Sequence, residues 1–275
     1  MTTILITLVF SFFGVDLMKI VTFNVRYDKP DPGNGAWIWR RRVIAQLIAQ
    51  WDADLLGTQE GKAHQLLDLH RRSGDYQSVG ADRQGTGLSE YCAVFYHQRR
   101  WQCLKRGDFW LSETPKLVAS VTAEWENPVP RMVSWGVFAS PDRQKPIILF
   151  NTHFDYQSQR ARELSAELIR DRLSQFNADE YLFVVTGDFN AEPESLPRQT
   201  LLQPLGNGVQ LRDALADMDL DEQMSYHEFT GQGLAAVDTI YYDSRLNLHQ
   251  VRVDRTQIDR VWPSDHFPVI AQFHG

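Results

Sequence analysis

The sequence contains little cysteine: two residues, Cys92 and Cys103, in a chain of 275. They fall in neighbouring strand-like runs, and a hairpin turning at residues 98–99 would place them diagonally rather than opposite each other. That arrangement is too long for an easy disulfide. We therefore expect two reduced thiols in the core, and the cysteine content does not require an oxidising compartment.

Long hydrophobic runs are also missing. The apolar stretch Ile4–Val15 is far shorter than the roughly 20 residues that span a bilayer, and Asp16 follows it directly. It has neither a basic segment before it nor a small-residue cleavage pattern after it. We expect no transmembrane segment, an over-extended start over residues 1–17 with Met18 as the natural initiator, and a cytoplasmic protein. The alternative is a cleaved signal peptide and secretion.

Positive charge is not in excess, because the formal net charge is −7. This balance disfavours a surface built for broad, sequence-independent binding to polyanions. It does not exclude a nucleic-acid substrate, since a catalytic metal would offset several acids and a local basic patch can persist.

Internal repeats and a Pro/Ser-rich linker are absent from the sequence. The acids and histidines that carry chemistry come from both ends of the chain, so the two halves must meet around one site. We expect residues 18–275 to form a single domain and the protein to be a monomer.

Strand-like segments outnumber helical ones. The predicted strands are Lys19–Phe23, Leu55–Thr58, Gln77–Gly80, Tyr91–Tyr96, Trp101–Trp110, Val118–Trp125, Met132–Ala139, Pro146–Asn151, Tyr181–Val185, Val237–Tyr241, Leu248–Val253 and Pro268–Phe273. Helical periodicity predicts helices at Trp39–Trp51, Ala63–His70 and Gln157–Phe176.

This order of elements favours an α/β fold of four layers, in which two mixed β-sheets stack and helices flank them. Such a sandwich buries many strands without exposed edges. A parallel doubly wound sheet is less favoured, because residues 91–139 contain several strands with no helix between them.

Five strand-like runs end or begin beside Asp, Glu, Asn or His. These residues are Asn24, Glu60, His153 with Asp155, Asp188 with Asn190, and Asp265 with His266. Serine and cysteine are almost missing from these positions. The set suits a hard divalent cation together with imidazole acid–base chemistry, and it does not suit an acyl-enzyme.

The same blocks resemble the endonuclease/exonuclease/phosphatase superfamily, which has the DNase I-like fold. The matching motifs, in the family's order, are Val21–Asn24, Thr58–Glu60, Asn151–His153, Gly187–Asn190 and Ser264–His266. The superfamily includes pancreatic-type DNases, abasic-site endonucleases, neutral sphingomyelinases, inositol-phosphate phosphatases and deadenylases. The resemblance extends from about Lys19 to Phe273, and it implies a metal-dependent phosphoesterase.

Within the superfamily, the chain is similar to a bacterial group that resembles the carbon-catabolite-repressor deadenylases. The segments Phe109–Pro115, Asp188–Pro193 and Asp265–Val269 carry this similarity. One departure is Thr239, which stands after Asp238 where these relatives usually have Tyr.

Glu60 and Asp265 are the predicted metal ligands, because their anionic oxygens are the hard ligands that Mg²⁺ prefers. Asn24 can add a neutral contact to the metal or to phosphate. The two carboxylates have no other charge partner evident in the sequence and would repel each other without a cation. We therefore expect a requirement for Mg²⁺, with Mn²⁺ as an alternative.

The resemblance implies the catalytic roles. His266 would take a proton or stabilise the phosphate, with Asp238 orienting its ring. Asp188 would orient or deprotonate the attacking water, and Asn190 would donate its amide to a phosphate oxygen. His153 would lie across the scissile phosphate. Glu90, directly before a strand, is the residue that we expect to hold His153.

Substrate contacts are assigned to Arg131, Asp155, His227 and Trp39, together with Glu90. Each has a plainer alternative. Asp155 could cap the helix that follows, Arg131 could be an ordinary surface residue, and His227 could be an inert loop histidine. Trp39, in or near the rim segment that follows Asn24, could stack on a base or sugar, or could anchor its helix to the core.

The resulting hypothesis is in-line attack by water on a phosphate ester, without a covalent intermediate. The preferred substrate is RNA or a nucleotide, as for a 3′–5′ RNA exonuclease. The alternative is a phosphatase or phosphodiesterase acting on a sugar phosphate, inositol phosphate or sphingomyelin. A catalytically dead binding module of the same fold is disfavoured, because all the expected acids and histidines are retained.

Overall fold

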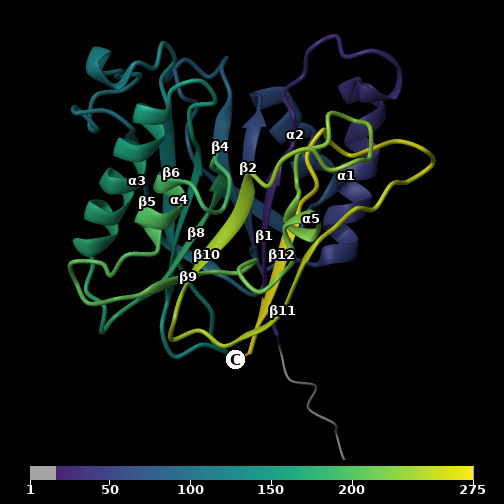
Figure 1. Cartoon of the computed structure of the whole chain (residues 1–275). Helices are drawn as coiled ribbons and strands as arrows, with labels where there is room; N and C mark the ends of the chain where they lie inside the picture. Colours follow the sequence, from purple (N-terminus) through teal and green to yellow (C-terminus); the bar gives the residue numbers. More distant parts are fainter. Residues whose placement is uncertain (1–16, 275) are drawn as a thin grey trace, which may run out of the picture.

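The strands stack as two six-stranded mixed sheets in a computed structural model that describes residues 17–274 (Figure 1). The first sheet has the order β11 (Leu248–Val253), β12 (Val269–Phe273), β1 (Met18–Asn24), β2 (Leu55–Gly61), β4 (Tyr91–His97) and β3 (Tyr76–Val79). The second sheet has the order β5 (Gln102–Trp110), β6 (Met132–Ala139), β7 (Ile147–His153), β8 (Leu182–Asp188), β10 (Asp238–Asp243) and β9 (Leu211–Asp213).

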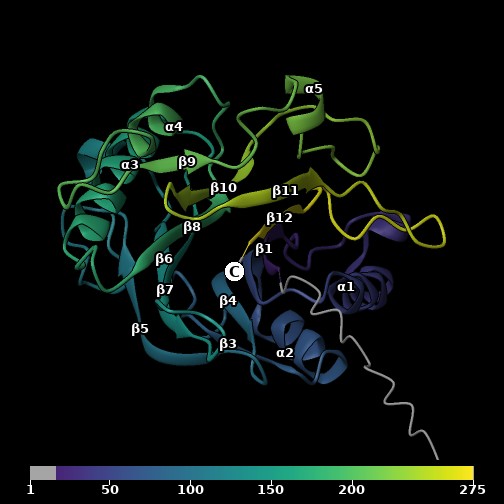
Figure 2. The ribbon, with the colours of Figure 1, turned by 90° about the horizontal axis from the view of Figure 1, so that it is seen from below.

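Helices cover the two outer faces. They are α1 (Trp37–Trp51), α2 (Ala63–Arg72), α3 (Gln159–Ser174), α4 (Leu196–Leu201) and the short α5 (Leu220–Gln223). Helices α1 and α2 pack apolar side chains against the first sheet, and α3 and α4 pack against the second sheet. Seen from below, these two pairs lie on opposite sides of the sheets (Figure 2). The predicted four-layer sandwich is therefore confirmed.

The apolar layer between the sheets explains why the strands read as continuous hydrophobic runs. Ile20 and Leu55 from the first sheet meet Leu149, Val184 and Ile240 from the second, and all five are fully buried. Because the outer faces are buried under helices as well, the central strands have apolar side chains on both faces. Simple alternation is consequently lost.

One edge of the sandwich collects the polar residues that the sequence singled out. Strands β1, β2, β7 and β8 end there, whereas β4, β6, β10 and β12 begin there. Because each sheet combines one parallel pair, β1–β2 or β7–β8, with antiparallel neighbours, chain segments far apart in sequence place their polar ends side by side.

Three expectations about local structure are wrong. Residues 118–125 form turns and a short 3-10 helix, Ala123–Trp125, rather than a strand. Cys92 and Cys103 do not share a hairpin, because β4 and β5 belong to different sheets. Both are free thiols, as expected, but only Cys92 is buried, and Cys103 is partly exposed rather than in the core. The sequence also gave no indication of β9, α4 and α5.

The expectations for the N-terminal extension fall on residues 1–17, of which 1–16 lie outside the described part of the chain. In residues 17–274, no helix combines the length and the apolar character needed to cross a membrane.

Gly57 lies where the two sheets are packed too closely for a side chain, and this position gives a stability prediction. A Cβ at this position would lie 2.2 Å from Thr186 Oγ1 and 2.6 Å from Asn151 Oδ1. We expect Gly57→Ala to destabilise the protein by about 1–3 kcal/mol through overpacking. The melting temperature should fall by several degrees, on the order of 5 °C.

Gly74→Ala is the matched control, because a Cβ there meets nothing within 4 Å in the described residues. Thermal unfolding of both variants would be followed by circular dichroism. Equal melting temperatures for the two alanine variants would show that the sheets accommodate the additional methyl group without loss of stability.

Candidate active site

A buried amide joins the acids of the two sheets. The Nδ2 atom of Asn24, at the end of β1, donates to Glu60 Oε1 at 3.0 Å and to Asp188 Oδ2 at 2.9 Å. Glu60 lies at a β-bulge in β2 with a positive φ of 67°, and such bulges re-aim side chains. The backbone N–H of Tyr27 donates to Glu60 Oε2 at 3.0 Å. These contacts fix the Glu60 carboxylate at the functional edge.

His266 and Asp238 form a direct pair. His266 Nδ1 lies 2.7 Å from Asp238 Oδ2, and its Nε2 faces Asp188 Oδ2 at 3.8 Å. Burial opposes the charged imidazole, but the Asp238 and Asp188 carboxylates raise the pKa of His266 to about 10. Burial and the charge of Asp238 raise the pKa of Asp188 to about 7. The geometry therefore favours an imidazolium facing a carboxyl group.

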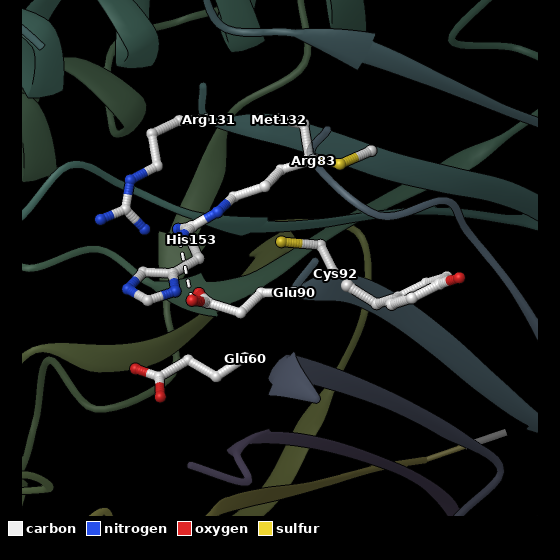
Figure 3. Close-up of a pocket in the computed structure, with 8 residues that line it drawn as sticks. Glu60, Arg83, Glu90, Cys92, Arg131, Met132 and His153 are labelled. Atoms are coloured by element: carbon white, nitrogen blue, oxygen red, sulfur yellow. Dashed lines mark hydrogen bonds and ion pairs between the residues drawn. The ribbon is translucent and has the colours of Figure 1, made fainter. Parts of the chain in front are cut away.

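His153 lies on the other side of Asp188, with Nε2 3.5 Å from Asp188 Oδ2. Burial and the nearby Arg131 guanidinium lower the pKa of His153 well below its ordinary value. The expected contact from Glu90 to His153 is wrong: Glu90 Oε1 accepts a hydrogen bond from Arg83 Nη2 at 2.8 Å instead (Figure 3). An arginine in the loop after β3 is a stronger partner for a carboxylate than a neutral imidazole.

Arg131 is a buried residue, not a surface residue. It is 5% exposed, and its Nε lies 3.6 Å from Asp155 Oδ2. Within residues 17–274, neither Nε nor Nη1 of Arg131 finds a hydrogen-bond partner. Asp155 Oδ1 accepts from the backbone N–H groups of Gln157 and Ser158. Asp155 thus orders the turn before α3 and also anchors Arg131, while Ser158 caps the helix.

These side chains line a small recess beside the acids, with a cavity volume of about 10 Å³ (Figure 3). Its lining residues are Glu60, Arg83, Glu90, Tyr91, Cys92, Arg131, Met132 and His153. Two guanidinium groups and two carboxylates thus face a single cavity, next to an imidazole.

Asp265 has a cationic neighbour that the sequence reading missed. Arg26 Nη1 lies 3.3 Å from Asp265 Oδ2, so the expectation that Asp265 lacks a charge partner other than a metal is wrong. Burial still raises the pKa of Asp265. Asn190 adopts a positive φ of 46°, and its Nδ2 donates to the Phe154 carbonyl at 3.1 Å.

Three of the residues assigned to the substrate, Asp155, His227 and Trp39, lie outside the pocket lining. His227 is fully buried and stacks on the Phe267 ring with centroids 3.8 Å apart. Trp39 is 58% exposed on the first turn of α1. It is Trp37 that anchors this helix, through a hydrogen bond from Nε1 to Asp68 Oδ2 at 3.0 Å.

Sequence reasoning also overlooked Arg26 and Arg83. Arg26 follows two residues after Asn24, in the backbone turn that Asn24 Oδ1 closes by accepting from the Arg26 N–H at 2.9 Å. Arg83 lies in the glycine-containing loop before Glu90. Arg26 could have been predicted from its position two residues after Asn24. The ion pair between Arg83 and Glu90 could not, because it depends on how the loop between them folds.

The donor set fits a hard divalent cation. Ligand atoms of Glu60, His153 and Asp188 all lie within 4.8 Å of one another, and Asn24 contacts both acids. The raised pKa of Asp188 shows that its buried negative charge is not fully compensated by the protein. The ligand atoms of a second group, Asp188, Asp238 and His266, also lie within 4.8 Å of one another. In that group, however, Asp238 and His266 are already hydrogen-bonded to each other.

Comparison with known proteins places this geometry in context. A model of the Endonuclease/Exonuclease/phosphatase family matches residues 21–266. A structure of a family member from Bacteroides vulgatus superimposes with a TM-score of 0.84 and 27% identity, covering 94% of this chain and 99% of the other. A Bacteroides thetaiotaomicron mannosyl-6-phosphatase gives a TM-score of 0.82 and 27% identity, covering 94% and 100%.

A curated sequence relative is the carbon catabolite repressor protein 4 homolog 6 of Arabidopsis thaliana. It is 22% identical over 177 residues, which are 58% of this chain. The match spans only 22% of that relative's length.

The Asp238–His266 contact gives a prediction for catalysis. His266→Ala and Asp238→Asn should each lower kcat by about 100-fold or more, because an imidazole acts efficiently only when a partner orients and polarises it. The double variant should lose little more than His266→Ala alone. Steady-state kinetics of the four proteins provide the double-mutant cycle.

In the same cycle, the NMR titration of His266 should move to lower pKa in Asp238→Asn, because the carboxylate that raises this pKa is gone. Losses that multiply independently would show that the two residues do not act as a pair.

Proposed function

Because the chain belongs to the Endonuclease/Exonuclease/phosphatase family and is a metal-dependent phosphoesterase, we propose that it removes phosphate from a small polyol phosphate of the sugar-phosphate class. The side chains around the pocket beside the acids carry this proposal. The pocket itself is a narrow recess of about 10 Å³, far below the roughly 300–1,000 Å³ of pockets for drug-sized ligands. It therefore encloses neither a base nor a sugar, and the polar groups around it would hold the substrate at its mouth.

The chemistry of the pocket supports the same choice. Arg131 has unpaired N–H groups that can donate to phosphate oxygens, in the fork geometry that suits this anion. The Glu90–Arg83 pair presents acceptors and donors that match the hydroxyl groups of a polyol. Tyr91 is the one aromatic side chain among the lining residues, which offers no stacked platform for bases.

The relatives add weight to this substrate class. The mannosyl-6-phosphatase aligns over nearly the whole of both chains. The net charge of −7 also disfavours a long polyanion as substrate.

The proposed roles follow from distance. Asp188, within 3.8 Å of both His153 Nε2 and His266 Nε2, would hold and deprotonate the attacking water. His266, oriented by Asp238, would hydrogen-bond the non-bridging phosphate oxygens as their charge grows. His153 and Asn190 would contact the phosphate from the opposite side. These positions allow in-line attack without a protein nucleophile.

Glu60 and Asp188 would hold a divalent cation, and we propose Mg²⁺, with Mn²⁺ as the alternative, because carboxylate oxygens are hard ligands. Asn24 would orient both carboxylates through its Nδ2, and it would ligate the ion only if its amide turned Oδ1 away from the Arg26 N–H. Asp265 would join them if Arg26 turned away. The bound ion supplies Lewis-acid stabilisation of the phosphate charge.

A nuclease of the deadenylase type is the second candidate. The similarity of the curated Arabidopsis relative favours it. Trp39 favours it as well, because its exposed ring on the first turn of α1 is available to stack on a base. On this alternative, bases would stack outside the small pocket while the scissile phosphate reaches the same acids.

A substrate panel separates the two candidates. With Mg²⁺ in excess, we expect phosphate release from hexose 6-phosphates, including mannose 6-phosphate, to exceed in kcat/KM the shortening of a 5′-labelled oligoadenylate. Malachite-green phosphate release and denaturing gels measure the two activities. Efficient trimming of the oligonucleotide, with no phosphate released from any sugar, would establish the nuclease instead.

Glu90→Gln refines the panel. We expect it to raise KM for the hexose phosphate about tenfold, through loss of charge-assisted hydrogen bonds to hydroxyl groups, and to leave KM for phenyl phosphate unchanged. Glu113→Gln is the control, since Glu113 is exposed in a turn.

Metal dependence gives the next prediction. Excess EDTA should abolish activity, and Mg²⁺ should restore it. Glu60→Gln should weaken metal binding, measured by calorimetry with Mn²⁺, and lower kcat by a factor on the order of 100 or more, while circular dichroism shows an intact fold. Full activity in EDTA would contradict the assignment of a catalytic metal.

A further inference from the structure

Arg40 is fully buried, although it lies in the first turn of α1, where the helix dipole disfavours a cation. Its guanidinium donates four hydrogen bonds, all to backbone carbonyls. Nε donates to Gly35 at 2.7 Å, Nη1 to Val25 at 2.7 Å and Pro263 at 3.0 Å, and Nη2 to Arg26 at 3.1 Å. Among the described residues, no carboxylate accepts a hydrogen bond from it. Arg40 therefore binds backbone carbonyls rather than a carboxylate or an external phosphate.

Three of the four carbonyls belong to two segments that end at the active site, and the fourth, that of Gly35, lies in the 3-10 helix Gly33–Gly35 just before α1. Two of them follow Asn24 within two residues, and the carbonyl of Pro263 lies two residues before Asp265. The antiparallel ladder between β1 and β12 ends at the pair Thr22–Val269. Beyond that pair the segments are no longer joined by strand hydrogen bonds, and the Arg40 guanidinium bridges them.

The environment of Arg40 keeps its charge in place. Burial lowers its pKa to about 10, and the charges of Asp265 and Asp31 partly offset this effect, so the guanidinium stays protonated at neutral pH. The rings of Trp37 and Phe229 lie 5.3 and 5.7 Å from its central carbon. Replacing a buried charge by an apolar residue often leaves the stability of a protein unchanged or raises it. If Arg40 served only to stabilise the fold, a buried guanidinium would therefore be a costly choice.

We propose that Arg40 is a positioning residue of the active site, which fixes the segment bearing Asn24 against the segment bearing Asp265 and His266. It touches neither substrate nor reacting atoms. The proposal rests on the roles proposed above for Asn24 and His266, but not on the choice of substrate. The physical basis is that one rigid, planar guanidinium donates hydrogen bonds to backbone carbonyls of both segments, and thereby fixes the distance between the segments.

Arg40→Lys is the most informative variant. Lysine retains the charge, but it has one nitrogen and cannot serve carbonyls on both segments as a planar fork does. Arg40→Met keeps approximate volume and removes every donor. Arg41→Met is the matched control, because Arg41 lies on the same helix, half-buried, and pairs with Asp68 at 3.4 Å.

The assay uses p-nitrophenyl phosphate and bis(p-nitrophenyl) phosphate at saturating Mg²⁺, well below each variant's melting temperature. Near-UV circular dichroism verifies the native fold. We expect Arg40→Lys to lower kcat at least tenfold with KM changed by less than about threefold, because a misplacement of about 1 Å can cost on the order of 100-fold in rate. Arg41→Met should keep kcat within a factor of two.

His266→Ala and the double variant Arg40→Lys/His266→Ala distinguish a positioning role from general stabilisation. If Arg40 acts through the His266 segment, the double variant should lose little more than His266→Ala alone. A folded Arg40→Lys protein with wild-type kcat, or losses that multiply independently, would overturn the proposal.

The remaining outcomes are also decisive. Full activity of His266→Ala would overturn the site assignment, and the positioning role with it, whereas an inactive His266→Ala beside a fully active Arg40→Lys overturns the positioning role alone. Failure of both Arg40→Lys and Arg40→Met to fold would assign Arg40 to global stability, and would contradict a role confined to the active site.

Discussion

The active site depends on polar contacts that cross the interface between the two sheets. Asn151, fully buried in β7, donates through Nδ2 to the carbonyls of Thr58 and Ala93, at 2.8 and 3.1 Å, in the opposite sheet. Its Oδ1 accepts from Gln59 Nε2 at 2.7 Å. An unpaired buried amide is costly, so these bonds allow essentially one register of the two sheets. That register brings Asn24 of one sheet to Asp188 of the other, at 2.9 Å.

Fixing the sheets in this way concentrates like charges, and the chain compensates them only in part. Arg26 faces Asp265, and amide donors stabilise Glu60, whose pKa is lowered despite its burial. By contrast, the pKa of Asp188 rises to about 7 because burial and Asp238 outweigh its donors. The protein therefore keeps a deficit of positive charge at the point where Glu60 and Asp188 meet. On the proposed function, a divalent cation would fill this deficit, and the phosphate ester would bind through that cation.

Much of this arrangement could be predicted from the sequence, because it depends on local features. An apolar run that ends in Asp, Asn or His identifies both the strand and the polar group at its end, and the four-layer fold follows from the order of such runs. Partners are different, because they depend on the folded loops. Glu90 contacts Arg83 rather than His153, and β4 pairs with β2 and β3 rather than with β5. Hydrophobic alternation identifies a strand but carries no information about which strand lies beside it.

The division between strands and loops also determines how substrate choice can vary. The groups proposed to bind the metal and to activate water stand at strand ends, held by the sheet ladders and, on our proposal, by the buried donors of Arg40. Arg83 and Glu90 stand outside the strands, in the segment between β3 and β4, and Arg131 directly precedes β6. A change in those segments can alter which alcohol carries the phosphate without moving Asp188 or His266. If the proposed roles hold, the residues around the small pocket, rather than the acids, decide whether a chain of this fold acts as a phosphatase or as a nuclease.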